Sequence, residues 1–166
     1  MPKPPSLRDE IRMSRPFSSR SQEVVLSLLH TADVVRRRFD AVVEPAGVTL
    51  QQYNVLRILR GAGTEGLPTL DVAARMVEQT PGITRLIDRL EDKGWVERRR
   101  CTEDRRRVFC VITPAGLALL ADLDPAVQAV DDQALEHLGG APLGELVEVL
   151  DRVRDAFRQP TSLAKP

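Results

Sequence analysis

The sequence predicts a mainly α-helical fold that carries a small β-hairpin. Three observations support this prediction. Apolar residues recur at helical spacing over most of the chain. Glycine-rich breaks at Gly61–Gly63 and Gly139–Gly140 separate the helical stretches. Two short runs rich in β-forming residues, at 95–100 and 108–112, depart from the helical pattern and indicate strands.

The helix predicted between Thr80 and Gly94 has one apolar and one polar face. Thr80 suits the N-cap, and Pro81 suits the first helical position, where a backbone N–H is not needed. The apolar stripe consists of Ile83, Leu86, Ile87 and Leu90. The outer face consists of Gly82, Thr84, Arg85, Asp88 and Arg89. Threonine and arginine read base edges in the major groove, although an ordinary surface helix with solvated charges has the same pattern.

A shorter amphipathic helix is predicted just upstream, at 69–76, with apolar positions at Leu70, Val72, Ala73 and Met76. Only residues 77–79 link the two helices, which predicts a helix-turn-helix over about 69–94 whose second helix is the reader. The two strands follow directly and predict a wing over about 95–112. Leu67–Pro68 is a short run that could pair weakly beside this wing. Together these elements indicate a winged helix-turn-helix head.

The predicted wing is strongly basic. Residues 97–107 contain six arginines against Glu97, Glu103 and Asp104. A hairpin tip with this charge is costly to fold unless an anionic partner faces it, and DNA is such a partner. The alternative is a solvated wing whose arginines pair with its own acids. Charge is also segregated along the chain, because residues 122–158 are rich in acids although the net charge is zero.

The head resembles the multiple-antibiotic-resistance regulator (MarR) family of transcription factors. The resemblance is carried by 84–99 (TRLIDRLEDKGWVERR), by 103–113 (EDRRRVFCVIT) and by the following Pro114-Ala115-Gly116. It covers about 21–158, and Asp104-x-Arg106 is its most specific motif. The resemblance implies that Arg106 reaches toward the minor groove and that Asp104 orients it. Arg105 and Arg107 are then candidate phosphate contacts.

The expected function is that of a sequence-specific DNA-binding transcriptional regulator, a ligand-responsive repressor on a double-stranded DNA operator. The competing interpretation is a protein-interaction module that uses the winged-helix fold without reading DNA. The basic wing favours the regulator. The residues expected to bind DNA are Thr80, Pro81, Gly82, Thr84, Arg85, Arg89, Asp104, Arg105, Arg106 and Arg107.

Helices at about 21–44 and 113–158 carry apolar stripes that a small winged head does not need. The final stripe consists of Leu143, Leu146, Val147, Leu150, Val153 and Phe157. We expect these helices to form a two-fold homodimer, as in the resembled family, which would match a palindromic operator. Packing of the same helices onto their own head is the alternative. Pro125 is expected to kink or split its helix near Leu123.

The expected domain organisation is a flexible basic arm at 1–20, a single MarR-type domain at 21–158 and a tail at 159–166. No apolar run is long enough to span a bilayer and no signal-peptide core begins the chain, so we expect a cytoplasmic protein without membrane contact. A hydrophobic content of 42% in 166 residues is ordinary for one globular domain.

Catalytic and metal chemistry finds little support, and we predict neither an enzyme nor a cofactor. The chain has two histidines, His30 and His137, and no metal-ligand cluster or nucleophile–base motif. Cys101 and Cys110 flank the wing as packing residues or, less simply, as a redox pair. The resemblance implies a small aromatic or lipophilic effector. His30 and Tyr53 are its candidate contacts, although a histidine on a helix is more often an ordinary helix residue.

Overall fold

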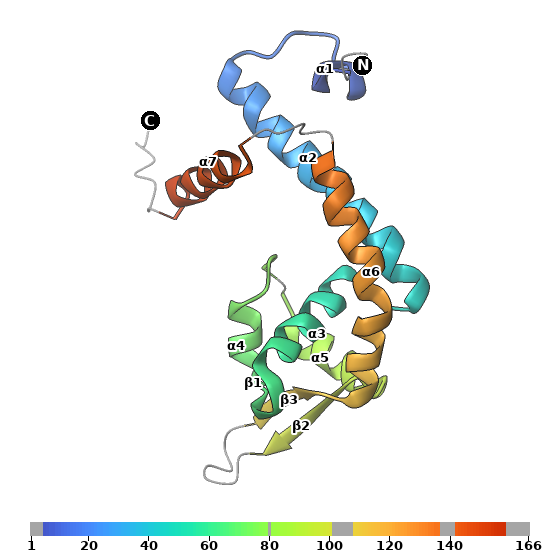
Figure 1. The fold of residues 1–166 in the computed structure, drawn as a ribbon. Coiled ribbons are helices and arrows are strands. Elements are labelled where there is room, and N and C mark those ends of the chain that lie inside the picture. Colours follow the sequence, from blue (N-terminus) through green and yellow to red (C-terminus); the bar gives the residue numbers. More distant parts are fainter. Residues whose placement is uncertain (1–4, 80, 101–107, 137–141, 159–166) are drawn as a thin grey trace. The chain divides into compact units, whose positions relative to one another are not determined.

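The computed structural model describes residues 5–79, 81–100, 108–136 and 142–158. It divides into two units, 1–130 and 131–166, and each is described by itself. The elements (Figure 1) are, in order, α1 (Leu7–Glu10), α2 (Arg20–Val43), η1 (Glu44–Ala46), α3 (Leu50–Ala62), η2 (Gly63–Glu65), β1 (Leu67–Pro68), α4 (Thr69–Ala74), α5 (Ile83–Asp92), β2 (Val96–Arg100), β3 (Val108–Ile112), α6 (Pro114–Glu136) and α7 (Leu143–Ala156). This order of helices around a small sheet confirms the predicted fold class.

Local capping explains where the first long helices begin. Ser19 precedes α2, and its hydroxyl accepts a hydrogen bond from the Gln22 amide at 3.1 Å. Thr49 and Gln52 form a reciprocal capping box at the start of α3, with distances of 3.2 and 3.1 Å. Gly63 ends α3 with a positive φ of 65°. The limits predicted for the first long helix are confirmed to within one residue, and α3 ends inside the predicted break at Gly61–Gly63.

The sheet is antiparallel and has the order β1-β3-β2. The central strand β3 pairs Ile112 with Val96 and Cys110 with Arg98 of β2. On its other side Cys110 pairs with Leu67 of β1, which confirms the weak pairing expected for Leu67–Pro68. The predicted wing strands at 95–100 and 108–112 are confirmed within one residue.

One core joins the helices of the head to the sheet. Its fully buried side chains include Leu56 and Leu59 of α3, Ile87 and Leu90 of α5, and Leu120 of α6. Leu86 is 8% exposed, and Ile83 is partly buried against the same cluster, so the predicted stripe of the reading helix is confirmed. Trp95 also packs against this core, where α5 leads into β2.

The connection between α4 and α5 differs from the prediction. Residues 75–82 link the two helices, so the predicted three-residue turn at 77–79 is wrong. Gly82 is the N-cap of α5 with a φ of 85° and no side-chain cap, so the prediction that Pro81 is the first helical residue is also wrong. Glycine adopts this left-handed conformation without strain, and the helix begins only after it. Thr80, the predicted cap, lies outside the described residues.

Two further expectations are corrected. Leu70 was expected to point inward, but it is 79% exposed because it lies about 200° around the short helix α4 from the fully buried Val72. α6 is continuous through Pro125, so the predicted split is wrong. The exposed Pro125 removes one backbone donor, while Leu123 and Val127 on either side of it remain buried in the core and hold the helix. Gly139–Gly140 lies outside the described residues.

The helix of the second unit has an apolar side that the described residues of that unit leave exposed. α7 begins after Pro142, and none of its residues is buried. Leu143, Leu146 and Val147 are each more than 40% exposed, and Phe157, at the C-cap, is 77% exposed. An apolar stripe of this size at the surface indicates an interaction site.

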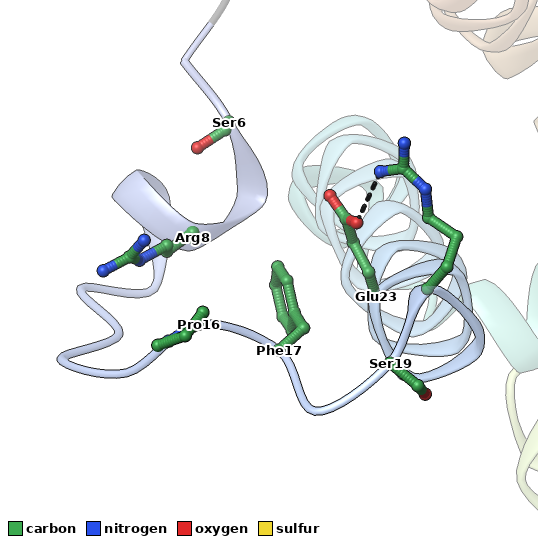
Figure 2. Close-up of a pocket in the computed structure, with 7 residues that line it drawn as sticks. Ser6, Arg8, Pro16, Phe17, Ser19 and Glu23 are labelled. Carbon is green, nitrogen blue, oxygen red and sulfur yellow. Dashed lines mark hydrogen bonds and ion pairs between the residues drawn. The ribbon is translucent and has the colours of Figure 1, made fainter.

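Residues 5–20, expected to form a flexible arm, contain the one-turn helix α1. Ser6 caps it, and Glu10 Oε2 lies 3.0 Å from His30 Nε2 of α2. A shallow, open pocket of about 410 Å³ lies beside the start of α2, and Figure 2 shows Phe17 projecting into it. Its lining consists of Ser6, Arg8, Pro16, Phe17, Ser19, Arg20 and Glu23.

Gly116 allows α6 to approach β2 closely, and Gly116→Ala is expected to destabilise the fold by about 1–3 kcal/mol. A Cβ atom there would lie 2.4 Å from the Trp95 carbonyl oxygen and 2.8 Å from Ile112 Cγ1, so the backbone must shift. Urea denaturation measures the loss. Gly61→Ala in α3 is the control, since its Cβ would meet nothing within 4 Å and alanine favours a helix. Equal stability of the two variants would contradict the expected clash.

Candidate nucleic-acid interface

The outer face of α5 presents the residues that the sequence predicts to read DNA. Thr84, Arg85 and Arg89 are exposed, and Leu86, Ile87 and Leu90 hold the opposite side of the helix in the core. Arg85 and Arg89 are one helical turn apart and so share this face. Among the residues that the structure describes, neither arginine forms an ion pair. Both guanidinium groups are therefore exposed on the outer face of α5 and unpaired with the described acids.

The two acids that lie near this face are engaged by a strand. Arg98 of β2 donates from Nη2 to Asp88 Oδ1 at 2.6 Å and from Nη1 to Glu91 Oε2. Its backbone amide donates to Glu91 Oε1 at 3.1 Å. Burial alone lowers the pKa of Arg98, but the hydrogen bonds with Asp88 and Glu91 outweigh it, and the pKa is raised. A permanent cation thus pairs with two carboxylates of α5 at once.

Sequence reasoning did not identify this role of Arg98. It offered Glu97, Glu103 and Asp104 as acids that could pair with wing arginines, whereas Arg98 pairs with acids of α5. Only Arg99 follows that expectation among the described pairs, with Nε 2.5 Å from Glu97 Oε1. The available signal was the spacing of Asp88 and Glu91, which places them on one side of a helix that a basic strand follows.

The predicted wing contacts are beyond what the structure describes. Asp104, Arg105, Arg106 and Arg107 lie outside the described residues, as does Thr80 at the other end of the site. Pro81 and Gly82 are described and exposed, just before α5. Arg100, at the end of β2, is exposed and has no ion pair within the described part of the chain.

Polar contacts hold the C-terminal end of α5, and the connection that precedes α5, within the head. Lys93, at the C-cap of α5, donates to the Gly47 carbonyl at 2.5 Å and lies 4.8 Å from the centre of the Trp95 ring. In the connection between α4 and α5, the amide of Val77 donates to Asn54 Oδ1 of α3 at 3.2 Å. The first contact ties the end of α5 to the segment that follows α2, and the second ties the α4–α5 connection to α3.

The two predicted effector contacts lie in different surroundings. His30 on α2 is half-buried and contacts Glu10 of the N-terminal segment. Tyr53 is 3% exposed in the core of the head, with the Arg57 guanidinium 5.9 Å from its ring centre. The contacts described here do not bring the two side chains together.

The structure describes one of the two cysteines that flank the wing. Cys110 is buried and forms no disulfide, with Sγ 3.6 Å from Thr69 Oγ1, whereas Cys101 lies outside the described residues. The described ranges contain no cluster of three histidine, cysteine or acidic side chains arranged to hold a metal. In those same ranges, no helix combines the length and apolar character needed to cross a bilayer.

Comparison with known proteins assigns this head to a family. A family model described as MarR family matches residues 48–108. The crystal structure of a MarR transcription factor from Planctomyces limnophilus is 40% identical and covers 82% of this chain and 98% of its own, with a TM-score of 0.63. The chain belongs to the MarR family. This MarR-family protein is thus a transcription regulator with a winged helix-turn-helix DNA-binding head.

Two further proteins extend the likeness of this MarR-family protein over most of its length. The HTH-type transcriptional regulator FarR of Neisseria gonorrhoeae is 28% identical over 86% of this chain and 98% of the relative. Sco3205, a MarR family transcriptional regulator from Streptomyces coelicolor solved in complex with DNA, is 22% identical. It covers 92% of this chain and 97% of its own with a TM-score of 0.74, which shows a shared fold.

Proposed function

We propose that this MarR-family protein is a sequence-specific repressor that places α5 in the major groove of a double-stranded DNA operator. One observation supports the proposal above others. Arg85 and Arg89 are exposed without ion pairs among the described residues, while Arg98 engages the acids beside them. Arginine reads guanine edges through paired hydrogen bonds, and threonine contacts bases or the thymine methyl group, so Thr84 is proposed as a neighbouring contact. Pro81 and Gly82 allow the start of the helix to approach the groove closely.

The proposed acting form is a homodimer. The exposed stripe of α7 supplies apolar surface in one unit, and α2 supplies more in the other, including the exposed Val24, Val25 and Leu29. A two-fold pair of heads matches a palindromic operator with half-sites about 34–36 Å apart, one turn of DNA. The proposed domain organisation keeps 21–158 as the regulator domain, flanked by the segments at 1–20 and 159–166.

Repression is proposed to respond to a small aromatic or lipophilic effector, since ligand-responsive repression is typical of the family. His30 and Tyr53 remain the proposed contacts, and a tryptophan or ligand-fluorescence titration of His30→Ala would test the first of them. We assign the chain no catalytic activity, because the family is one of regulators. The cytoplasm is its proposed compartment, since a transcription regulator meets DNA there.

A selection from a random-sequence duplex library tests DNA reading without knowledge of the operator. The wild-type protein is expected to enrich a palindrome, and the enriched duplex is then compared with a scrambled duplex of the same composition. Specific affinity is expected to exceed non-specific affinity by about a thousandfold or more at fixed salt. Equal binding to both duplexes, or none, would favour the protein-interaction module instead.

The wing is proposed to hold a second contact, and Arg106→Ala is expected to weaken binding of the selected duplex about tenfold or more. A narrow minor groove concentrates negative potential, which an inserted arginine exploits. Asp104 is proposed to orient this side chain, and Arg105 and Arg107 to contact phosphates. Fluorescence anisotropy at fixed salt measures the loss, with Arg38→Ala on α2 as the charge-matched control. Unchanged affinity would contradict the minor-groove assignment.

A further inference from the structure

We propose that Arg98 is a positioning residue that fixes the wing to the reading helix, so that both reach DNA in one arrangement. This inference rests on the proposed function for its consequence at DNA, but its structural part can be tested without DNA. The motivating observation is the juxtaposition of a strand guanidinium with two carboxylates of the helix that reads.

The register of the sheet shows why Arg98 has this place. Arg98 pairs with Cys110, which is fully buried, so the two side chains share the face of the sheet that packs on the core. Val96 lies two residues earlier on the same face of β2 and is 2% exposed. Arg100 lies two residues later on that face, and it is exposed without an ion pair in the described ranges. Arg98 therefore marks the point where β2 leaves the core.

The geometry of the contact favours a fixed arrangement. The guanidinium contacts Asp88 and Glu91, which are one turn apart on α5, and the Arg98 amide holds Glu91 as well. A planar fork with several donors suits two acceptors at once, which a lysine ammonium cannot reproduce in the same plane. The Arg98 side chain is only 25% exposed, so water screens the contact less than it screens a pair at the surface.

The same contact also keeps the reading face available. Asp88 lies three residues after Arg85, and side chains at this spacing are neighbours on a helix. A free Asp88 would compete with DNA for Arg85. Because Arg98 holds Asp88 at 2.6 Å, Arg85 keeps its donors for base edges. Loss of Arg98 is thus expected to loosen the attachment of the wing to α5 and also to let Asp88 compete with DNA for Arg85.

The first experiment is amide hydrogen exchange on the full-length protein without DNA. In Arg98→Met, the β3 amides at 108–112 are expected to exchange about tenfold faster, while Val55 and Leu56 in the core of α3 keep their wild-type rates. Arg99→Met is the matched control. It removes the same charge from the neighbouring residue, which pairs with Glu97 and not with an acid of α5. Wild-type exchange of β3 in Arg98→Met would overturn the proposal, and so would equal acceleration of α3, which indicates a general loss of stability.

The second experiment measures affinity for the duplex selected by the wild type. Arg98→Met is expected to weaken binding about tenfold, and Arg99→Met less than about threefold, at the same salt. Arg98→Lys keeps the positive charge but not the planar guanidinium group. It is expected to bind the duplex clearly more weakly than the wild type and to exchange its β3 amides clearly faster. Full rescue by lysine would mean that charge alone matters and would overturn the positioning role. If the wild type selects no duplex, the proposed DNA reading fails, whereas hydrogen exchange still decides whether Arg98 fixes the wing.

Discussion

Replacing Leu150 with aspartate is expected to convert the dimer into monomers at micromolar concentration. Leu150 lies in the middle of the apolar stripe of α7, between the exposed Leu146 and Val147 and the more distal Val153 and Phe157. A carboxyl group in such an interface either stays charged without a partner or takes up a proton. Protonation at pH 7 from an ordinary pKa near 4 costs about 4 kcal/mol per subunit, which corresponds to about a thousandfold in the dimerisation constant for each of the two carboxyl groups that is buried.

Sedimentation of the wild type and of Leu150→Asp measures this change. The sign of its pH dependence follows from burial, which raises the pKa of the introduced carboxyl group in the dimer. The defect is therefore full at and above the raised pKa, and it diminishes as the pH falls below that value toward the ordinary pKa near 4. Arg152→Asp is the control, because it places the same group on the opposite side of α7, where residue 152 is exposed. A monomeric wild type would refute the dimer and, with it, the palindromic operator.

Arg85→Ala is expected to cost about 1–3 kcal/mol of specific binding and to relax the preference at particular base pairs. Arg85 is exposed at the first turn of α5, where a recognition helix meets base edges. Its neighbour one turn along α5, Asp88, is held by Arg98, so no described ion pair has to break before DNA binds. The side chain is thus ready to form paired hydrogen bonds with a guanine.

A comparison of the selected and the scrambled duplex decides between base and phosphate contact for Arg85. A base contact lowers affinity for the selected duplex far more than for the scrambled one. A phosphate contact lowers both alike and flattens the dependence of affinity on salt by about one unit. Arg38→Ala on α2 removes the same charge away from the head and is expected to change neither affinity strongly. Equal losses on the two duplexes for Arg85→Ala would contradict the base-reading role.

The sequence predicts those parts of the fold that depend on neighbouring residues. The stripe of Leu86, Ile87 and Leu90 has helical spacing, and the capping pair Thr49 and Gln52 lies within one turn. The wing strands were found within one residue because β-forming residues flank a short polar segment on both sides. The exposed reading face of α5 follows directly, since the residues left over from a buried stripe must point outward.

The remaining features depend on contacts between distant segments, which local patterns do not specify. The pairing of Arg98 with Asp88 requires the packing angle between β2 and α5, and sequence spacing does not give that angle. The start of α5 depends on the left-handed conformation of Gly82, although a proline directly before it is a strong start signal. The continuity of α6 through Pro125 results from buried leucine and valine side chains on either side, which outweigh the loss of one hydrogen bond.

The order β1-β3-β2 leaves two strands at the edges of the sheet, and an edge with free backbone groups can pair with the edge of another chain. β1 is only two residues long, and its Pro68 has no N–H to donate. β2 ends at Arg100, which is exposed and has no ion pair among the described residues, so its charge disfavours a second copy of the same strand. The positive charge that suits this wing to DNA therefore also disfavours pairing of the edge strand β2 with a strand of another chain, which protects the regulator from aggregation while it folds.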